Sequence, residues 1–250
     1  KNMQKSMDKI HEVYMGENSS VFTQKTRERI HWICEQCVGK QILDVGCSQG
    51  TIPLLLGQAG KHVLGIDVEA EAISYAQNLL NQEPEEVRKR VAYQCCDVLS
   101  FLADTTYDTV ILTEVLEHIL DVDSVLKMIT SLINPDGRII ITVPFGINDF
   151  WDHKRTYYVA QLYKQLVPYY AIDAVKLFDN WIGVVGRKQS MDKNDFKLST
   201  MEIALIEAEE EAFYKRERLL INDRDRYKKA CQEQKAATYH AVEEVGSLKE

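Results

Sequence analysis

The sequence predicts an α/β fold with a mostly parallel sheet of seven strands, helices on both faces of that sheet, and a charged helical tail. Two observations predict the sheet, which we expect within residues 41–189. The first is a series of short runs of Ile, Val and Leu, and the second is the amphipathic segments that separate these runs. Together they are typical of parallel strands that are covered by their connecting helices. A third observation predicts the tail, because the composition changes abruptly near residue 190 and becomes strongly charged.

Strands and helices are expected to alternate from residue 41 onward. Runs rich in β-branched residues mark the strands, and amphipathic stretches mark the helices. The expected strands are 41–47, 61–68, 91–98, 107–115, 138–145, 171–178 and 181–188. The expected helices between them are 51–60, 69–82, 120–133 and a segment that contains Leu162 and Leu166. The composition of Asn134-Pro135-Asp136-Gly137 predicts a turn before the fifth strand.

Both ends of the chain are expected to be helical. Residues 1–40 form an N-terminal helical segment with an apolar stripe that runs from Ile30 to Cys37. Residues 190–250 form a helical linker or coiled-coil-like tail, because Met201–Lys235 contains neither Pro nor Gly. The apolar seam of this tail is interrupted by charges, so we expect a solvated helix that could also join an oligomer.

The composition argues against several classes of partner. A net charge of −8 gives no electrostatic reason to expect duplex nucleic acid or an anionic membrane. No apolar run approaches the ~20 residues of a membrane span. The cysteines are expected to be free thiols in a reducing cytoplasm; they are Cys34, Cys37, Cys47, Cys95, Cys96 and Cys231. Because the chain begins at Lys1, we expect a piece of a longer protein.

The stretch Gly46-Cys47-Ser48-Gln49-Gly50 follows the first expected strand and has three interpretations. A nucleophile elbow of the G-x-S-x-G type would make Ser48 a nucleophile, but it needs an oxyanion loop from an earlier strand, and the sheet has none. A dinucleotide loop, G-x-G-x-x-G, would need glycines where Ser48 and Thr51 stand. The third interpretation, a loop that binds the cofactor of a methyltransferase, accounts for more residues.

Acidic residues end the first four expected strands: Asp44, Asp67, Asp97 and Glu114. With the glycine loop, this series resembles the class I S-adenosylmethionine-dependent methyltransferases, whose first motif is D-x-G-x-G-x-G. The resemblance covers residues 41–188, with Ser48 in place of the middle glycine. It implies a Rossmann-like fold and S-adenosyl-L-methionine as the cofactor.

The resemblance also implies a role for each strand end. Gly46 lets the backbone approach the methionine part of the cofactor, and Asp67 accepts hydrogen bonds from the ribose hydroxyls. Asp97 takes the adenine amino group. Asp44 fixes the loop and compensates the cationic charge of the cofactor. The cofactor-binding residues predicted in this way are Asp44, Gly46, Cys47, Ser48, Gly50, Asp67, Val68, Asp97, Val98 and Thr113, with the side chain of Val98 against the adenine ring.

Methyl transfer to a hydroxyl needs an oriented acceptor and a base. His153 is the predicted base, since it lies in the polar and aromatic stretch after the fifth strand. His118 and Glu114, after the fourth strand, are the other predicted catalytic residues. Further candidates follow the same two strands: Glu117, Asp152, Lys154 and Arg155.

No metal is predicted, although one alternative includes it. Glu114, Glu117 and His118 are spaced i, i+3, i+4, so a short helix would place them on one face, where they could bind a divalent ion with His153. This E-x-x-E-H pattern with a later D-H-K is similar to the small-RNA 3′-terminal 2′-O-methyltransferases. In many methyltransferases without metal, the same residues pack beside the cofactor.

The chain as a whole resembles methyltransferase domains of bacterial surface-polysaccharide assembly proteins. The stretches that carry this resemblance are "RERIHWICEQCVGKQILDVGCSQG", "TVPFGINDFWDHKRTYY" and the charged tail. It implies O-methylation of a sugar hydroxyl in an O-antigen or S-layer glycan, and fused glycosyltransferase or kinase modules. Phe150, Trp151, Tyr157 and Tyr158 are the aromatic residues that would stack on a sugar.

Two further expectations concern the N-terminal segment and the acceptor. The stretch Tyr14–Phe22 would form a lid over the acceptor. Arg27 and Arg29 are interpreted as solvated helix charges, with the cofactor carboxylate as their alternative partner. Two other functions stay open: a small-molecule O- or C-methyltransferase of the quinone-biosynthesis type, and an inactive cofactor-binding scaffold.

Overall fold

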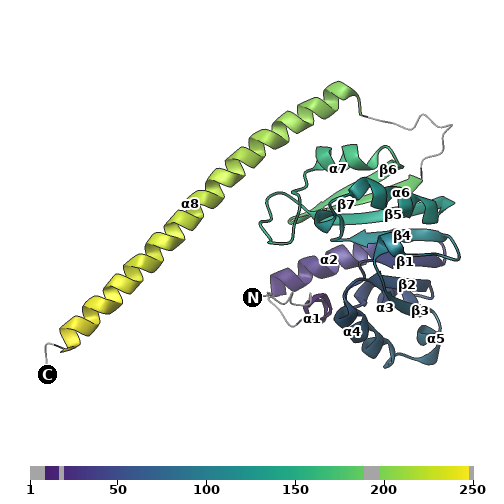
Figure 1. Ribbon diagram of the computed structural model, residues 1–250, viewed down its shortest axis with the longest axis horizontal. Helices are drawn as coiled ribbons and strands as arrows, with labels where there is room; N and C mark the ends of the chain where they lie inside the picture. The colour runs from purple at the N-terminus through teal and green to yellow at the C-terminus, as the bar shows by residue number, and fades with distance from the viewer. Residues whose placement is uncertain (1–8, 17–19, 189–197, 248–250) are drawn as a thin grey trace. The chain divides into compact units, whose positions relative to one another are not determined.

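A computed structural model describes residues 9–16, 20–188 and 198–247. One seven-stranded sheet has the order β3-β2-β1-β4-β5-β7-β6 (Figure 1). Strands β1 to β5 pair in parallel, and β7 runs antiparallel to both of its neighbours. The predicted Rossmann-like fold is therefore confirmed.

The strands are β1 (Gln41–Val45), β2 (His62–Asp67), β3 (Val91–Cys95), β4 (Tyr107–Thr113), β5 (Ile133–Pro144), β6 (Tyr170–Phe178) and β7 (Trp181–Lys188). The α-helices are α1 (Ile10–Met15), α2 (Ser20–Gln36), α3 (Thr51–Gln58), α4 (Ala70–Leu80), α5 (Glu85–Arg88), α6 (Val122–Leu132), α7 (Val159–Leu166) and α8 (Thr200–Ser247). Two 3₁₀ turns are η1 (Val98–Ser100) and η2 (Leu116–His118).

Alternate residues of the central strands face opposite sides of the sheet. Ile42 and Ile111 pack in the hydrophobic cluster that α2 and α3 complete. Their neighbours Leu43 and Val110 pack in the larger cluster formed with α6 and α7. Both faces are buried, which explains why these strands appear in the sequence as nearly continuous apolar runs.

The turn predicted at residues 134–137 is wrong. These residues belong to β5, which begins at Ile133. The pairing with β4 steps from Tyr107 opposite Ile133 to Thr109 opposite Arg138, so the intervening residues of β5 bulge out of the ladder. Local composition indicates the irregular backbone but not the strand pairing on either side of it.

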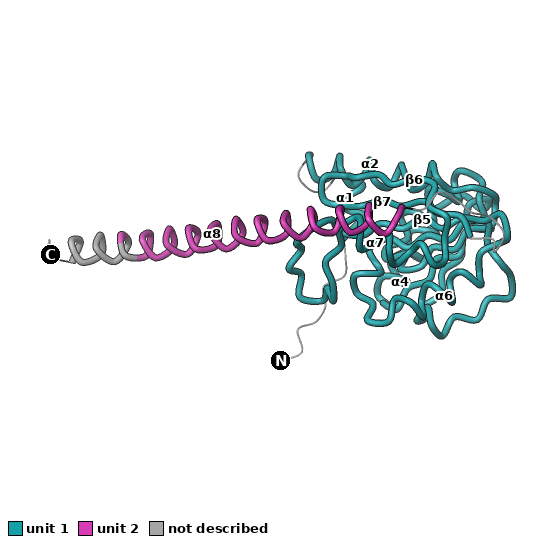
Figure 2. Tube along the Cα trace, turned by 90° about the horizontal axis from the view of Figure 1, so that it is seen from above, with its two compact units in different colours: residues 1–197 teal, residues 198–250 magenta. Residues whose placement is uncertain are grey.

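The chain divides into two compact units, Lys1–Lys197 and Leu198–Glu250 (Figure 2). The predicted boundary at residues 189 and 190 lies outside the described residues. Helix α8 begins with a capping box, in which the backbone N–H of Ser199 donates to Glu202 Oε2 at 2.8 Å and that of Glu202 to Ser199 Oγ at 3.2 Å. The predicted helical tail is therefore confirmed, and its coiled-coil character stays a prediction.

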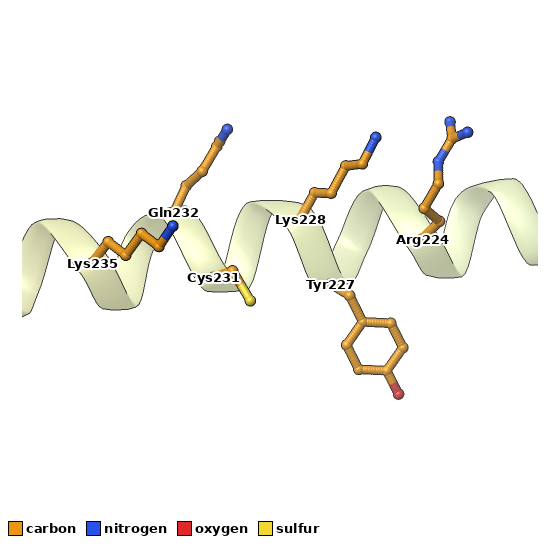
Figure 3. A pocket seen from close by; sticks show the side chains of 6 residues that line it. All are labelled: Arg224, Tyr227, Lys228, Cys231, Gln232 and Lys235. Atoms are coloured by element: carbon orange, nitrogen blue, oxygen red, sulfur yellow. The ribbon is translucent and has the colours of Figure 1, made fainter. Parts of the chain in front are cut away.

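A hollow on the tail is lined by residues of one helix. Figure 3 shows its lining side chains, which are Arg224, Tyr227, Lys228, Cys231, Gln232 and Lys235. Because all six belong to α8, the described residues provide no second element that would enclose a ligand. None of the described helices combines the length and apolar character needed to cross a bilayer.

Candidate active site

The parallel strands bring the predicted residues to one edge of the sheet. Asp44 lies on β1, Asp67 ends β2, and Glu114 follows β4. Asp97 lies two residues after the end of β3 and caps η1 by accepting the N–H of Leu99 at 2.7 Å. Since carboxyl ends of parallel strands share an edge, these four side chains converge on the region where ligands of open α/β sheets bind.

The glycine loop is shaped by its backbone. Gly46, Ser48 and Gly50 all have positive φ, at 74°, 46° and 76°. The N–H groups of Gly46 and Cys47 both donate to the carbonyl of Ile66, at 2.8 and 3.1 Å. These bonds fasten the loop to the end of β2.

Two positions of this loop differ in what they tolerate. A Cβ atom on Gly46 would lie 2.4 Å from Cγ2 of Val115, so the site requires glycine. Ser48 adopts a left-handed conformation that costs about 1 kcal/mol in a non-glycine residue. Its N–H donates to Asp67 Oδ2 at 2.8 Å, and this charge-assisted bond offsets the cost.

Asp67 is already engaged by the backbone. Its Oδ2 accepts the N–H of Ser48, and its Oδ1 accepts the N–H of Glu69 at 2.9 Å. A carboxylate has about four acceptor positions, so each oxygen retains capacity for one more donor. Two vicinal hydroxyl groups, as in a ribose, fit this remaining capacity.

Asp44 is buried without a hydrogen bond. Its relative exposure is 1%, and neither carboxylate oxygen has a hydrogen-bond partner among the described residues. Burial, together with the charge of Asp67, raises the pKa of Asp44 to about 8. The expectation that Asp44 fixes the loop is therefore wrong. A buried carboxyl group without a partner does fit a cationic ligand, as the sulfonium and ammonium groups of S-adenosylmethionine would be.

The apolar side chains near the expected adenine position differ in their exposure to solvent. Val98 is 8% exposed and packs in the main hydrophobic cluster, rather than presenting its side chain for a ring. Val68 and Leu99 are 58% and 55% exposed. Val68 follows Asp67 and Leu99 lies two residues after Asp97, and these two exposed side chains are available for stacking. Of the other predicted cofactor residues, Cys47 is buried and Thr113 half-buried.

On the acceptor side, the loops after β4 and β5 meet. Nδ1 of His118 lies 3.1 Å from Asp152 Oδ2, and Lys154 Nζ lies 3.1 Å from Asp152 Oδ1. The ring of His153 packs edge-on against that of His118, with centroids 4.9 Å apart. Because a carboxylate only accepts, Nδ1 of His118 donates to Asp152, which leaves Nε2 as the acceptor.

Glu114 does not join this group. It has a φ of 57° and precedes η2, so it shares no helix face with Glu117 and His118, and that prediction is wrong. Its carboxylate accepts Trp181 Nε1 at 2.9 Å and Thr142 Oγ1 at 3.0 Å. It also forms an ion pair with Arg29 at 2.8 Å.

Three of the residues considered for a metal do come together. Glu117, His118 and His153 have ligand atoms that all lie within 4.8 Å of one another. Glu117 is buried and the two histidines are half-buried. Carboxylate and imidazole are ligands for a divalent transition ion. The arrangement could thus serve either a metal or a base, and Glu114 belongs to neither.

The N-terminal segment contributes contacts that the sequence did not indicate. Arg29 is 5% exposed, so its interpretation as a solvated charge is wrong. Arg27 donates from Nε to the carbonyl of Tyr14 at 2.6 Å. The N–H of His11, on α1, donates to Gln49 Oε1 at 2.7 Å, which places α1 against the glycine loop. Part of the predicted lid, residues 17–19, lies outside the described residues.

The four aromatic residues after β5 fall into two pairs. Phe150 and Trp151 are 47% and 58% exposed, and the ring of Phe150 is 5.2 Å from that of His153. Tyr157 and Tyr158 are 1% and 7% exposed and belong to the interior. Only the first pair is available to a ligand. No pattern of spacing distinguishes the two pairs in the sequence.

Residues 22–178 match the methyltransferase-domain family. The chain belongs to this family. The match extends from α2 to the end of β6 and so contains the glycine loop, the acidic strand ends and both histidines. The predicted S-adenosylmethionine-dependent methyltransferase domain is confirmed at this level.

Curated relatives include two ubiquinone biosynthesis O-methyltransferases. The mitochondrial protein of Bos taurus is 37% identical over 106 residues, which are 42% of this chain and 28% of that protein. The protein of Aeromonas salmonicida (strain A449) is 32% identical over 117 residues, covering 46% and 48%. The matched segments therefore span less than half the length of these relatives.

Solved structures share the fold at low identity. Magnesium protoporphyrin IX methyltransferase from Synechocystis PCC 6803, with bound SAH, aligns with a TM-score of 0.56 at 18% identity, covering 72% of this chain and 92% of that chain. A glycopeptide N-methyltransferase complexed with S-adenosyl-L-methionine aligns with a TM-score of 0.58 at 12% identity, covering 65% and 87%.

Proposed function

We propose that the chain transfers the methyl group of S-adenosylmethionine to a hydroxyl group. The observation that carries this proposal is the His118–Asp152 pair, which lies at the same sheet edge as the glycine loop. A histidine with one nitrogen held by a carboxylate has its other nitrogen ready to accept a proton. A hydroxyl acceptor needs such a base, whereas a neutral amine is already a nucleophile.

The cofactor would be held by groups from the first three strands. The loop around Gly46 would lie against its methionine part, Asp67 would accept the ribose hydroxyls, and Asp97 would accept the adenine amino group. Asp44 would balance its positive charge. When bound, S-adenosylmethionine supplies an electrophilic methyl group; the side chains of the chain itself bind, orient and deprotonate.

The base would act as the new bond forms. A hydroxyl group has a pKa far above that of imidazole, so Nε2 of His118 would take the proton during attack rather than before it. Asp152 would keep the His118 ring in one tautomer and stabilise the imidazolium. His153, the base predicted from the sequence, packs against the His118 ring and would help to position the acceptor.

For the acceptor we propose a sugar hydroxyl of a bacterial surface glycan. The support is the exposed pair Phe150 and Trp151, whose rings lie 5.9 Å apart beside His153. Aromatic faces next to a polar catalytic group suit a hydroxylated ring. We expect this reaction in the cytoplasm, with glycosyltransferase or kinase modules joined to the domain.

A second candidate acceptor is a small molecule of the quinone-biosynthesis type, for which an ortho-diphenol serves as the probe. The similarity to the ubiquinone biosynthesis O-methyltransferases of Bos taurus and Aeromonas salmonicida favours it. The experiment compares both candidates with one labelled cofactor. Methyl-labelled S-adenosylmethionine is incubated with the full chain and either surface-glycan oligosaccharides or an ortho-diphenol, with Asp152→Asn as the control.

Each outcome of this experiment has a meaning. Label in the oligosaccharide supports the glycan proposal, and label only in the diphenol replaces it with the quinone-type acceptor. A chelator should not change the rate; loss of activity that a divalent ion restores would assign Glu117, His118 and His153 to a metal. Cofactor binding without methyl transfer to either acceptor would contradict both proposed acceptors and favour an inactive cofactor-binding scaffold.

A further inference from the structure

Glu114 is held by two hydrogen-bond donors and one ion-pair partner, which come from three separate elements. Trp181 on β7, Thr142 on β5 and Arg29 on α2 all contact its carboxylate, at 2.9, 3.0 and 2.8 Å. The guanidinium of Arg29 also stacks on Trp181, with Cζ 4.4 Å from a ring centroid. The side chain of Arg29 is only 6% exposed and that of Glu114 is 26% exposed, so the guanidinium end of this ion pair is withdrawn from water.

The backbone at Glu114 has an unusual conformation, which its side-chain contacts stabilise. Its φ of 57° lies in the left-handed region, which side chains with a Cβ disfavour. Its N–H donates to the carbonyl of Thr142 at 2.9 Å, directly at the end of β4. Glu114 is thus the residue at which the chain leaves the strand and turns toward η2, and its side-chain contacts hold that turn.

The residues that follow this turn in the sequence belong to the proposed active site. Val115 packs so close to Gly46 that a Cβ there would lie 2.4 Å away. Two residues further, Glu117 is buried, and its carbonyl accepts the N–H of Lys154 at 2.8 Å. His118 follows, paired with Asp152. A change at the turn would therefore move the proposed base relative to the loop after β5.

We propose that Arg29 is a positioning residue, which holds Glu114 in its left-handed turn from α2 and thereby sets the place of His118. The activity predicted for it rests on the proposed function. Arg29 itself contacts no group that we assign to the reaction. Its influence passes through the backbone of residues 114–118.

Helix α2 offers a matched control. Lys25, one turn before Arg29, forms an ion pair with Asp179 in the connection between β6 and β7. This pair also joins α2 to the sheet, but it touches no residue of the loop after β4. If Arg29 merely fastened the helix, Lys25→Met and Arg29→Met would have similar effects on the reaction.

The first experiment separates turnover from cofactor affinity in the full chain. Arg29→Met should lower kcat by at least about tenfold, because the base is displaced, while calorimetry gives a cofactor Kd within about twofold of the original. Lys25→Met should leave both values unchanged. Equal losses of kcat in the two variants, after correction for the folded fraction, would overturn the proposal.

The second experiment tests the turn itself. Glycine adopts positive φ freely, so Glu114→Gly should retain at least about threefold more activity than Glu114→Ala. For the same reason Arg29→Met/Glu114→Gly should be faster than Arg29→Met alone. Glu114→Ala and Glu114→Gly with equal rates would refute positioning through the backbone.

A third readout needs no turnover and so separates this proposal from the proposed function. The ¹⁵N shifts of the His118 ring report whether Nδ1 still donates to Asp152. They should change in Arg29→Met and return toward the original values in Arg29→Met/Glu114→Gly. If these shifts behave as expected in a chain that methylates nothing, the proposed function fails and the positioning role stands; unchanged shifts overturn the positioning role.

Discussion

The two sides of the candidate site are built in different ways. The cofactor side is centred on a loop shaped by its backbone, with three positive φ angles in five residues and two N–H groups that donate to Ile66, and carboxylates at the strand ends surround it. The acceptor side consists of side chains from distant segments, in which His118 meets Asp152 and Arg29 meets Glu114. A backbone site leaves a compact motif in the sequence, whereas a side-chain site does not.

The largest effect should come from the acceptor side. His118→Ala should lower the rate of methyl transfer by ~10² to 10⁴-fold, the usual contribution of a general base. Cofactor affinity should not change, because His118 follows β4, whereas Asp67 and Asp97 lie at the ends of β2 and β3. Single-turnover rates and calorimetry on the same preparation measure the two effects.

His153→Ala is the matched comparison, since His153 packs against His118 and was the base predicted from the sequence. We expect it to cost less than His118→Ala, mainly through acceptor KM. A larger loss of kcat in His153→Ala would restore the original assignment. Two fully active variants would move the base to Asp152 or to the N-terminal segment.

On the cofactor side, Asp67→Ala should weaken binding of S-adenosylmethionine by at least about tenfold. Hydrogen bonds to an ionised group contribute ~1.5–3 kcal/mol each, and the variant also frees the N–H groups of Ser48 and Glu69. Asp67→Asn should lose less, since it keeps one of the two acceptor oxygens. An unchanged Kd in the alanine variant would show that β2 does not carry the ribose site.

This contrast explains how much the sequence could predict. The seven strands, the glycine loop and the acidic strand ends follow from local patterns, namely apolar runs and small residues at a turn. The buried side chain of Arg29 and the carboxylate of Glu114 both contact Trp181, which lies far away in the chain. Periodicity on α2 shows which residues face inward, but not that a charged residue there has a partner on the sheet.

The buried carboxyl of Asp44 should make stability depend on pH. Its pKa is about 8 in the folded chain against an ordinary value of 3.8, so the folded state alone keeps this proton between those values. The free energy of unfolding contributed by Asp44 therefore decreases as pH rises through that range. Asn cannot ionise, so the Tm of Asp44→Asn should decrease less than that of the original chain between pH 6 and pH 9.

The protonation of Asp44 should also be coupled to binding of the cofactor. A cationic cofactor favours ionised Asp44, so binding near pH 7 should release a proton, which calorimetry in two buffers of different ionisation enthalpy detects. The asparagine variant should bind more weakly and release fewer protons. Proton release that is identical in both chains would mean that Asp44 does not sense the ligand charge.

The smallest effect should come from the side chain of Ser48, and this is the sharpest test of a site made of backbone. Glycine would relieve the left-handed conformation at φ 46° but would add unfolded-state entropy. These terms are each about 1 kcal/mol and opposite in sign, so Ser48→Gly should shift stability by less than about 1 kcal/mol. Ser48→Ala should keep methyl transfer within a few-fold, because only the N–H of this residue contacts Asp67.

Gly46→Ala, two residues away, should by contrast lose methyl transfer, since its Cβ would meet Val115 at 2.4 Å. Covalent labelling of Ser48 by a fluorophosphonate would revive the nucleophile elbow, and a severe loss in Ser48→Ala would show that the glycine loop itself also depends on a side chain.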